Sequence, residues 1–173
     1  EKSLEIDSNQ PGALNSRGVM LQNLNLNEEA VVSFNNAIDQ KPDYAEAYAN
    51  KANSLSVLKK FEEAQLSYDL AIYHRPNYAK AHFNKGKSLK ECGELKRAIL
   101  SFDLAIEFNP NIEYISGEIF HIKMLLCLWN NFSKSQKELK NKIIKNHKVI
   151  TPFPLLALID DPKLQKKAAE IYA

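Results

Sequence analysis

Cysteine is scarce in this chain: its 173 residues include only two, Cys92 and Cys127. They form no CxxC pair and no ligand histidine accompanies them, so the sequence predicts neither a metal site nor a structural disulfide. Both fall in expected helices. We therefore expect both to be reduced, buried thiols of a cytoplasmic protein.

Long apolar runs and a strong charge are missing too. No stretch approaches the roughly 18 apolar residues that a membrane-spanning helix needs. The chain opens on Glu1, Lys2 and Ser3 without a signal-peptide pattern, and because Met is missing there we expect a piece of a longer protein. The net charge of +2 is too small to argue for nucleic acid. We expect neither a nucleic-acid nor a membrane partner.

Signs of catalysis are absent as well. There is no Gly-rich phosphate-binding loop, and the histidines have no paired carboxylate at a helical spacing that would make one of them a base. We expect no catalytic residue, no metal ligand and no cofactor in these residues.

What the sequence has is a ladder that recurs every 34 residues. Each copy holds two small residues, an aromatic residue, a third small residue and a proline, in fixed slots. The copies are Gly18, Ala30, Phe34, Ala37 and Pro42; Ala52, Ala64, Tyr68, Ala71 and Pro76; and Gly86, Ala98, Phe102, Ala105 and Pro110. A fixed period of this kind predicts a repeat array rather than a single core.

Each copy reads as two amphipathic helices that form a hairpin. The small residues are expected where the two helices cross, and the aromatic residue is expected to fill the wedge between hairpins in a purely structural role. Asn25 to Asn27 and Gly93 carry the signals of the turn between the helices. The proline ends the second helix because it cannot continue the hydrogen-bond ladder.

These signals divide the chain into six segments. They are the end of a truncated repeat (1–10), three repeats (11–44, 45–78 and 79–112), capping helices (113–148) and an extended proline-containing segment with a terminal helix (149–173). We expect Asp161 to cap the terminal helix, with Pro162 at its first position.

The capping region shows two further patterns. Its first helix is expected to place an apolar face inward, formed by Ile115, Ile119, Ile122, Leu125 and Leu126. Its second helix carries Lys134, Lys137, Lys140, Lys142 and Lys145, largely outward. Because no aromatic residues alternate with these lysines, we favour a solvated face over a surface for nucleic acid or membrane.

The ladder resembles the tetratricopeptide repeat over residues 11–110; it departs at the first aromatic slot, where Leu14, Tyr48 and His82 stand. The resemblance implies an all-α fold, a right-handed superhelix of antiparallel helix hairpins. It also implies that the first helices line a concave groove that binds an extended peptide or a partner protein.

If the first helices line a groove, the residues not used for packing face into it. Asparagine or serine recurs there at Ser16, Asn50 and Asn84, with Asn15 and Asn53 beside them. Such amides suit the backbone of an extended peptide, although a merely solvated polar face would look the same. Lysines gather in the third repeat, where an acidic peptide is one possible ligand: Lys80, Lys87 and Lys90.

The tail carries a second resemblance. HIKMLLCLW, Phe132 and PFPLLALIDDPKLQKKAAEIYA are similar to the segment that joins the repeats to the catalytic region in bacterial, Spindly-like relatives of O-linked N-acetylglucosamine transferases. The resemblance implies a glycosyltransferase domain in cis after Ala173, with the groove of the repeats, lined by Asn50 and Asn84, recognising the acceptor protein. Two alternatives stay open: a structural scaffold that self-associates as a homodimer, and a chain that itself transfers sugar.

Overall fold

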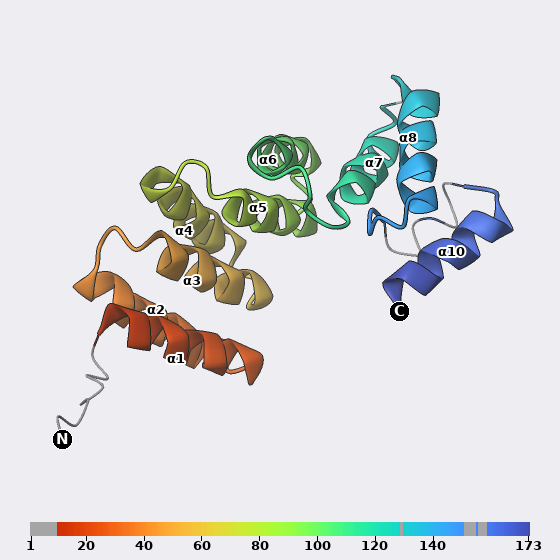
Figure 1. Ribbon diagram of the computed structural model, residues 1–173. Coiled ribbons are helices and arrows are strands. Elements are labelled where there is room, and N and C mark those ends of the chain that lie inside the picture. The colour runs from red at the N-terminus through yellow and green to blue at the C-terminus, as the bar shows by residue number, and fades with distance from the viewer. Residues whose placement is uncertain (1–9, 129, 151–154, 156–158) are drawn as a thin grey trace. The chain divides into compact units, whose positions relative to one another are not determined.

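The computed structural model describes residues 10–128, 130–150, 155 and 159–173. In these ranges every regular element is a helix, which confirms the all-α prediction (Figure 1). The helices are α1 (Pro11–Asn23), α2 (Asn27–Gln40), α3 (Ala45–Val57), α4 (Phe61–His74), α5 (Ala79–Glu91), α6 (Leu95–Phe108), α7 (Ile115–Leu125), α8 (Phe132–Ile144) and α10 (Pro162–Tyr172). The chain divides into two compact units between Glu94 and Leu95.

In the first unit, consecutive helices from α1 to α5 pack against one another. The turn after each first helix places one residue in the left-handed region: Asn25, Lys59 and Gly93. The amide of the next residue then donates to a carbonyl five positions back, for example Leu26 to Leu21 at 2.9 Å and Lys60 to Leu55 at 2.9 Å. These are Schellman turns, which satisfy carbonyls that the helix end leaves free.

The sequence signals found two of these three turns. Lys59 was not predicted, because lysine has no preference for a positive φ. It adopts that conformation because the turn has the same geometry in each copy.

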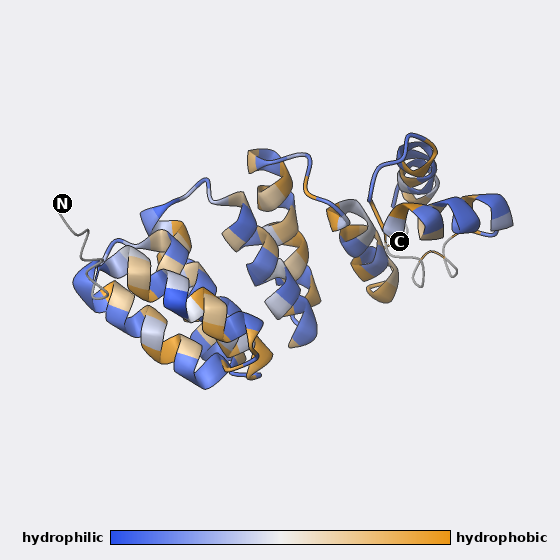
Figure 2. Ribbon diagram, turned by 60° about the horizontal axis from the view of Figure 1, so that its bottom comes forward, coloured by the Kyte–Doolittle hydropathy of each residue, from blue (hydrophilic) through white to orange (hydrophobic). Residues whose placement is uncertain are grey.

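The core of the first unit is built from the ladder. Ala52 and Ala64 bring α3 and α4 close together around the buried ring of Tyr68 and the side chain of Leu55. In the preceding copy, Gly18 lies directly against the ring of Phe34, which is fully buried. Each helix also carries polar residues, as helices packed on one side require (Figure 2).

We predict that Gly18→Ala destabilises the first unit. A Cβ atom at Gly18 would lie 2.7 Å from Cδ1 and 2.8 Å from Cζ of Phe34, so the ring must move in a packed core. Overpacking of this kind costs about 1–3 kcal/mol, which chemical denaturation measures. Gly12→Ala is the matched control, because a Cβ there meets nothing within 4 Å. Equal stability of the two variants would contradict the prediction.

The second unit has its own apolar cluster. It is formed by Phe120 of α7, Leu139 and Ile143 of α8, and Ala168 of α10, together with Val149 and Ile150 of the segment that follows α8. That segment crosses the start of α7. There the backbone amide of Tyr114 donates to the carbonyl of Lys148, and the backbone amide of Gly117 donates to the carbonyl of Val149 at 2.8 Å. Gly117 is required there, because a Cβ would lie 2.6 Å from Cβ of Ile150.

The structure corrects two expectations for α7. Ile115, Ile119 and Ile122 are buried as predicted, but Leu125 is 57% exposed. The helix ends at Leu125, and Cys127 lies in a left-handed turn just beyond it. Cys127 is therefore exposed rather than buried, because the residues that the periodicity carried past the helix end no longer follow its inner face.

The last segment is described only in part. Residues 151–154 and 156–158, where the extended segment was expected, lie outside the described residues. Leu155 is helical and buried, and its carbonyl accepts from the amide of Ile159 at 3.0 Å, which differs from an extended conformation at that residue. The predicted cap is confirmed: Asp161 accepts from the amides of Lys163 and Leu164 at 3.1 and 3.2 Å, with Pro162 at the first position.

Across the described ranges, no helix is long and apolar enough to span a membrane.

Candidate functional site

The first helices of the repeats in the first unit are linked by polar side chains. We call this set the polar face: Asn15, Gln22, Asn50, Asn53, Ser56, Asn84 and Ser88, from α1, α3 and α5. Gln22 joins α1 to α3 by donating to the carbonyl of Asn50 and to Oγ of Ser54, both at 2.9 Å. The hydroxyls of Ser56 and Ser88 lie 3.0 Å apart and join α3 to α5.

The four asparagines form two pairs, each between neighbouring first helices. Nδ2 of Asn50 donates to Oδ1 of Asn15 at 3.1 Å, and Nδ2 of Asn84 donates to Oδ1 of Asn53 at 2.9 Å. All four side chains are half-buried. In the part of the chain that the structure describes, each pair leaves one amide nitrogen and one carbonyl oxygen without a protein partner. Each pair therefore offers one donor and one acceptor.

Tyr68 extends the second pair into the core. Its ring is 1% exposed, and its hydroxyl donates to Oδ1 of Asn53 at 2.7 Å. Burial raises the pKa of this hydroxyl, because the ionised form would lose its hydration; a hydrogen bond with Ser56 lowers the pKa and the charge of Glu91 raises it further. Sequence reasoning gave this slot a purely structural role. The signal was Tyr68 in a slot where the other copies have Phe34 and Phe102.

A hollow of 390 Å³ lies over this second pair. Its wall combines amides, hydroxyls and charged groups with one apolar residue. The lining residues are Asn53, Ser56, Val57, Lys59, Tyr68, Asn84, Lys87, Ser88 and Glu91. Lys59 and Glu91 form an ion pair across it at 3.2 Å.

The other predicted site residues lie in different environments. Ser16 is exposed, and Asn50 donates to Oδ1 of Asn15 through Nδ2. Lys87 lines the hollow with its ammonium 5.9 Å from the centre of the Phe83 ring. Lys80 is exposed outside the hollow and Lys90 is half-buried. The roles of all these residues in binding stay predictions.

The arrangement provides hydrogen-bonding groups and charged side chains. Within the described residues, no group of three His, Cys, Asp or Glu side chains is placed to hold a metal ion. His82 is buried, and its Nε2 lies 2.9 Å from the carbonyl of Pro76, where it serves packing.

Comparison with known families identifies the repeats. Residues 45–78 and 79–112 each match the family model of the tetratricopeptide repeat. These two segments are therefore tetratricopeptide repeats, and the described helices confirm the solenoid fold predicted from the ladder.

Solved structures share this fold. The first TPR of Spaghetti (RPAP3), bound to the HSP90 peptide SRMEEVD, is 23% identical, with a TM-score of 0.66, and the match covers 72% of this chain and 98% of that one. MamA from Desulfovibrio magneticus RS-1 (residues 41 to the end) is 19% identical, with a TM-score of 0.65 and 76% of each chain covered. No curated protein matches this chain significantly.

We predict that the stability of the first unit falls at alkaline pH partly through Tyr68. Because the folded state raises the pKa of the hydroxyl above its usual 10.0, the unfolded chain loses this proton first. The contribution of Tyr68 to the free energy of unfolding is therefore complete below pH 10.0 and is lost as the pH rises above that value. Denaturation midpoints at about pH 9 and about pH 11 should differ less in Tyr68→Phe than in the wild type. An identical pH dependence of the two proteins would contradict a raised pKa of the buried Tyr68 hydroxyl.

Proposed function

We propose that the first unit is an interaction module that binds an extended segment of a partner polypeptide along the polar face. The observation that carries this proposal is the two asparagine pairs, Asn15 with Asn50 and Asn53 with Asn84. Each pair has one unused amide nitrogen as a donor and one unused carbonyl oxygen as an acceptor. A peptide unit has the complementary groups, one carbonyl and one N–H. An extended backbone can therefore bond to both pairs whatever its side chains are.

Two further features support this function. The hydrogen bonds within each pair, and that from Tyr68, hold the amides in place before a ligand arrives, so less side-chain entropy is lost on binding. The hollow beside Asn53, with Lys87 in its wall, can receive a side chain of the bound segment, and an acidic one suits the ammonium. The peptide complex of the Spaghetti (RPAP3) domain supports a peptide ligand for this fold.

The test is a titration with a peptide selected from a random display library. Asn50→Ala/Asn84→Ala removes the unused acceptor of each pair together with the hydrogen bond inside the pair, and losing two hydrogen bonds to the ligand should weaken binding about tenfold or more. Asn36→Ala/Asn77→Ala is the matched control, because both residues are exposed and lie outside the polar face. Isothermal titration calorimetry would contradict the proposal if both double variants bound like the wild type.

We further propose that the parent protein is a cytoplasmic, O-N-acetylglucosamine-transferase-like enzyme that uses this module to hold its acceptor. Support for the enzyme comes from the resemblance of residues 121–129, Phe132 and 152–173 to the joining segment of Spindly-like glycosyltransferases, which the recurring Asn50 and Asn84 also fit.

The alternative, a scaffold that forms a homodimer, stays a prediction. The most suitable contacts are the exposed apolar residues Val32 of α2 and Leu66 of α4, which occupy the same slot in successive repeats.

A further inference from the structure

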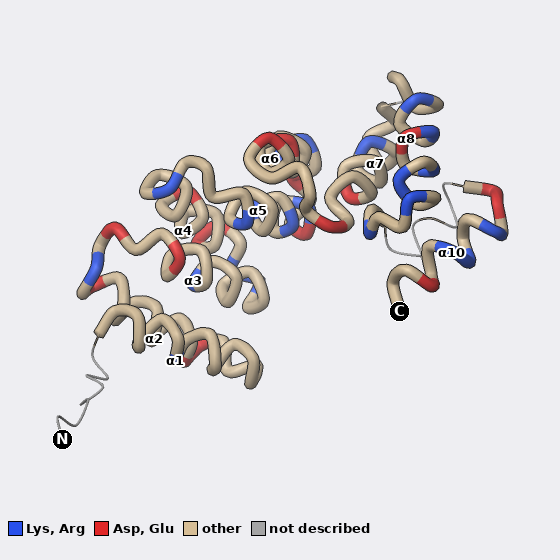
Figure 3. The backbone as a smooth tube through the Cα atoms, viewed as in Figure 1, with Lys and Arg blue, Asp and Glu red and all other residues tan. Residues whose placement is uncertain are grey.

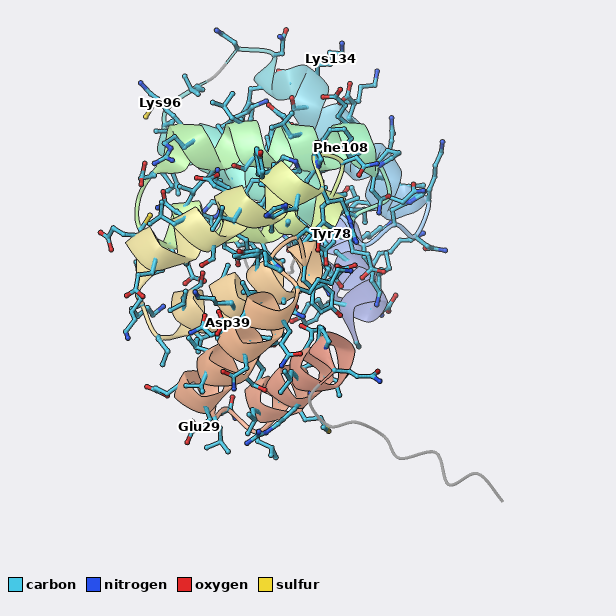
Figure 4. The ribbon with its side chains drawn as sticks, turned by 90° about the vertical axis from the view of Figure 1, so that its left-hand side faces the viewer. Glu29, Asp39, Tyr78, Lys96, Phe108 and Lys134 are labelled. Atoms are coloured by element: carbon cyan, nitrogen blue, oxygen red, sulfur yellow. The ribbon has the colours of Figure 1, made fainter. Side chains whose placement is uncertain are left out.

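The second unit has a strongly basic surface that the sequence alone could only partly outline. Residues 132–148 contain six lysines and one glutamate. Figure 3 shows the blue segments of α8 and α10, two helices that pack against each other. We call this surface the basic face: Lys134, Lys137, Lys140, Lys145, Lys148, Lys163 and Lys166. Lys134 points outward, away from the ribbon, in Figure 4.

The two helices are joined where α8 ends. Nζ of Lys167 donates to the carbonyl of Ile144 at 2.7 Å, and Ile143 and Ala168 share one apolar cluster. This contact brings Lys163 and Lys166 to the turn that carries Lys145 and Lys148. Sequence periodicity could not place lysines of two separate helices together.

Several of these lysines lie where they do not stabilise their own helices. Lys134 with Lys137, and Lys137 with Lys140, are like charges three positions apart on one helix, which destabilises it by about 0.2–0.5 kcal/mol per pair. Lys134 stands in the first turn of α8, where the helix dipole disfavours a cation and where α8 has no acidic residue. Lys163 stands in the first turn of α10, where the carboxylate of the N-cap Asp161 offsets part of the same effect. Helix stability therefore does not explain the positions of Lys134 and Lys137.

Protein carboxylates leave most of this charge uncompensated. Within the described ranges Lys134, Lys137, Lys140, Lys145, Lys148 and Lys163 form no ion pair. Lys166 has only a solvent-exposed contact with Glu170 at 3.9 Å. The first unit differs, since it pairs Lys59 with Glu91, Arg75 with Glu46 and Lys85 with Asp69.

The basic face is hollowed rather than flat. One hollow of 540 Å³ lies between the turn after α8 and α10, and its wall combines Asn146, Lys163 and Lys166 with the carboxylate of Glu170. A second hollow of 370 Å³ includes Asn146 again, with Asn111, Lys148 and the carboxylate of Glu113. Asn146 supplies amide donors and an acceptor at the edge shared by both.

We propose that the basic face binds an acidic segment of a partner polypeptide, at a site separate from the polar face of the first unit. A single extended chain can enter both hollows, with carboxylates on the lysines and its backbone on Asn146. A bilayer is a poorer fit, because Leu139 and Ile143 of α8 are buried in the core, and Ile144, which is 55% exposed, gives α8 only one exposed apolar side chain. Nucleic acid is a poorer fit because no aromatic residue lies among the lysines of α8 for base stacking.

The test uses a fluorescein-labelled oligoglutamate peptide and the full chain. Carbodiimide cross-linking joins carboxylates to contacting lysines, and mass spectrometry should locate the links on the basic face. In anisotropy titrations, Lys137→Glu/Lys145→Glu/Lys163→Glu should weaken binding about tenfold or more. Lys41→Glu/Lys60→Glu/Lys96→Glu is the matched control, with the same change of net charge at exposed sites outside the basic face.

Three outcomes would overturn the proposal. Links spread over all exposed lysines, or confined to Lys80, Lys87 and Lys90, would place the peptide elsewhere. Equal losses in both triple variants would show a net-charge effect only. Tighter, basic-face-dependent binding of duplex RNA or of phosphatidylserine vesicles would replace the polypeptide by another partner. Because Asn50→Ala/Asn84→Ala should leave the basic face intact, this test is independent of the polar face.

Discussion

The close approach of paired helices is the constraint on which the first unit depends. Where two helices cross at Ala52 and Ala64, the distance between their axes is set by small side chains, and the ring of Tyr68 fills the space that remains. The same contact recurs at Gly18 and Phe34. Since the hairpins α1–α2 and α3–α4 share this geometry, successive first helices stay near enough for asparagine side chains to bond across them. The polar face is therefore a consequence of the packing.

This dependence explains why the packing ladder can support the polar face without containing its residues. The ladder fixes the spacing, and the residues between its slots are free to vary. Asn53 connects the buried core to the polar face, because its Oδ1 accepts from the hydroxyl of the buried Tyr68 and also from Nδ2 of Asn84. A polar network with buried anchors keeps its geometry better than side chains held only by solvent. The site thus combines a rigid base with open donors and acceptors.

The sequence predicted most of the fold because periodicity reports packing directly. The slots of Phe34 and Tyr68, the breaks before Pro42 and Pro76, and the cap at Asp161 all follow from local chemistry.

The site was predicted less completely. The sequence placed Asn15, Asn50, Asn53 and Asn84 on the groove side but did not predict the hydrogen bonds of Asn50 to Asn15 and of Asn84 to Asn53. Partner choice between helices depends on their relative rotation, which a one-dimensional spacing does not contain. The conformation of Lys59 and the exposure of Cys127 depend on where helices end, and periodicity fixes ends poorly.

The central claim is that the polar face recognises the backbone of its ligand. Replacing single amides of a bound peptide by esters tests it most directly, because an ester keeps the side chains and removes one N–H donor. The account predicts that esters at the positions facing the two asparagine pairs weaken binding about five- to tenfold, as expected for a lost hydrogen bond, and that esters at other positions have little effect. Uniformly unchanged affinity across all ester positions, with strong losses on side-chain substitution, would contradict it.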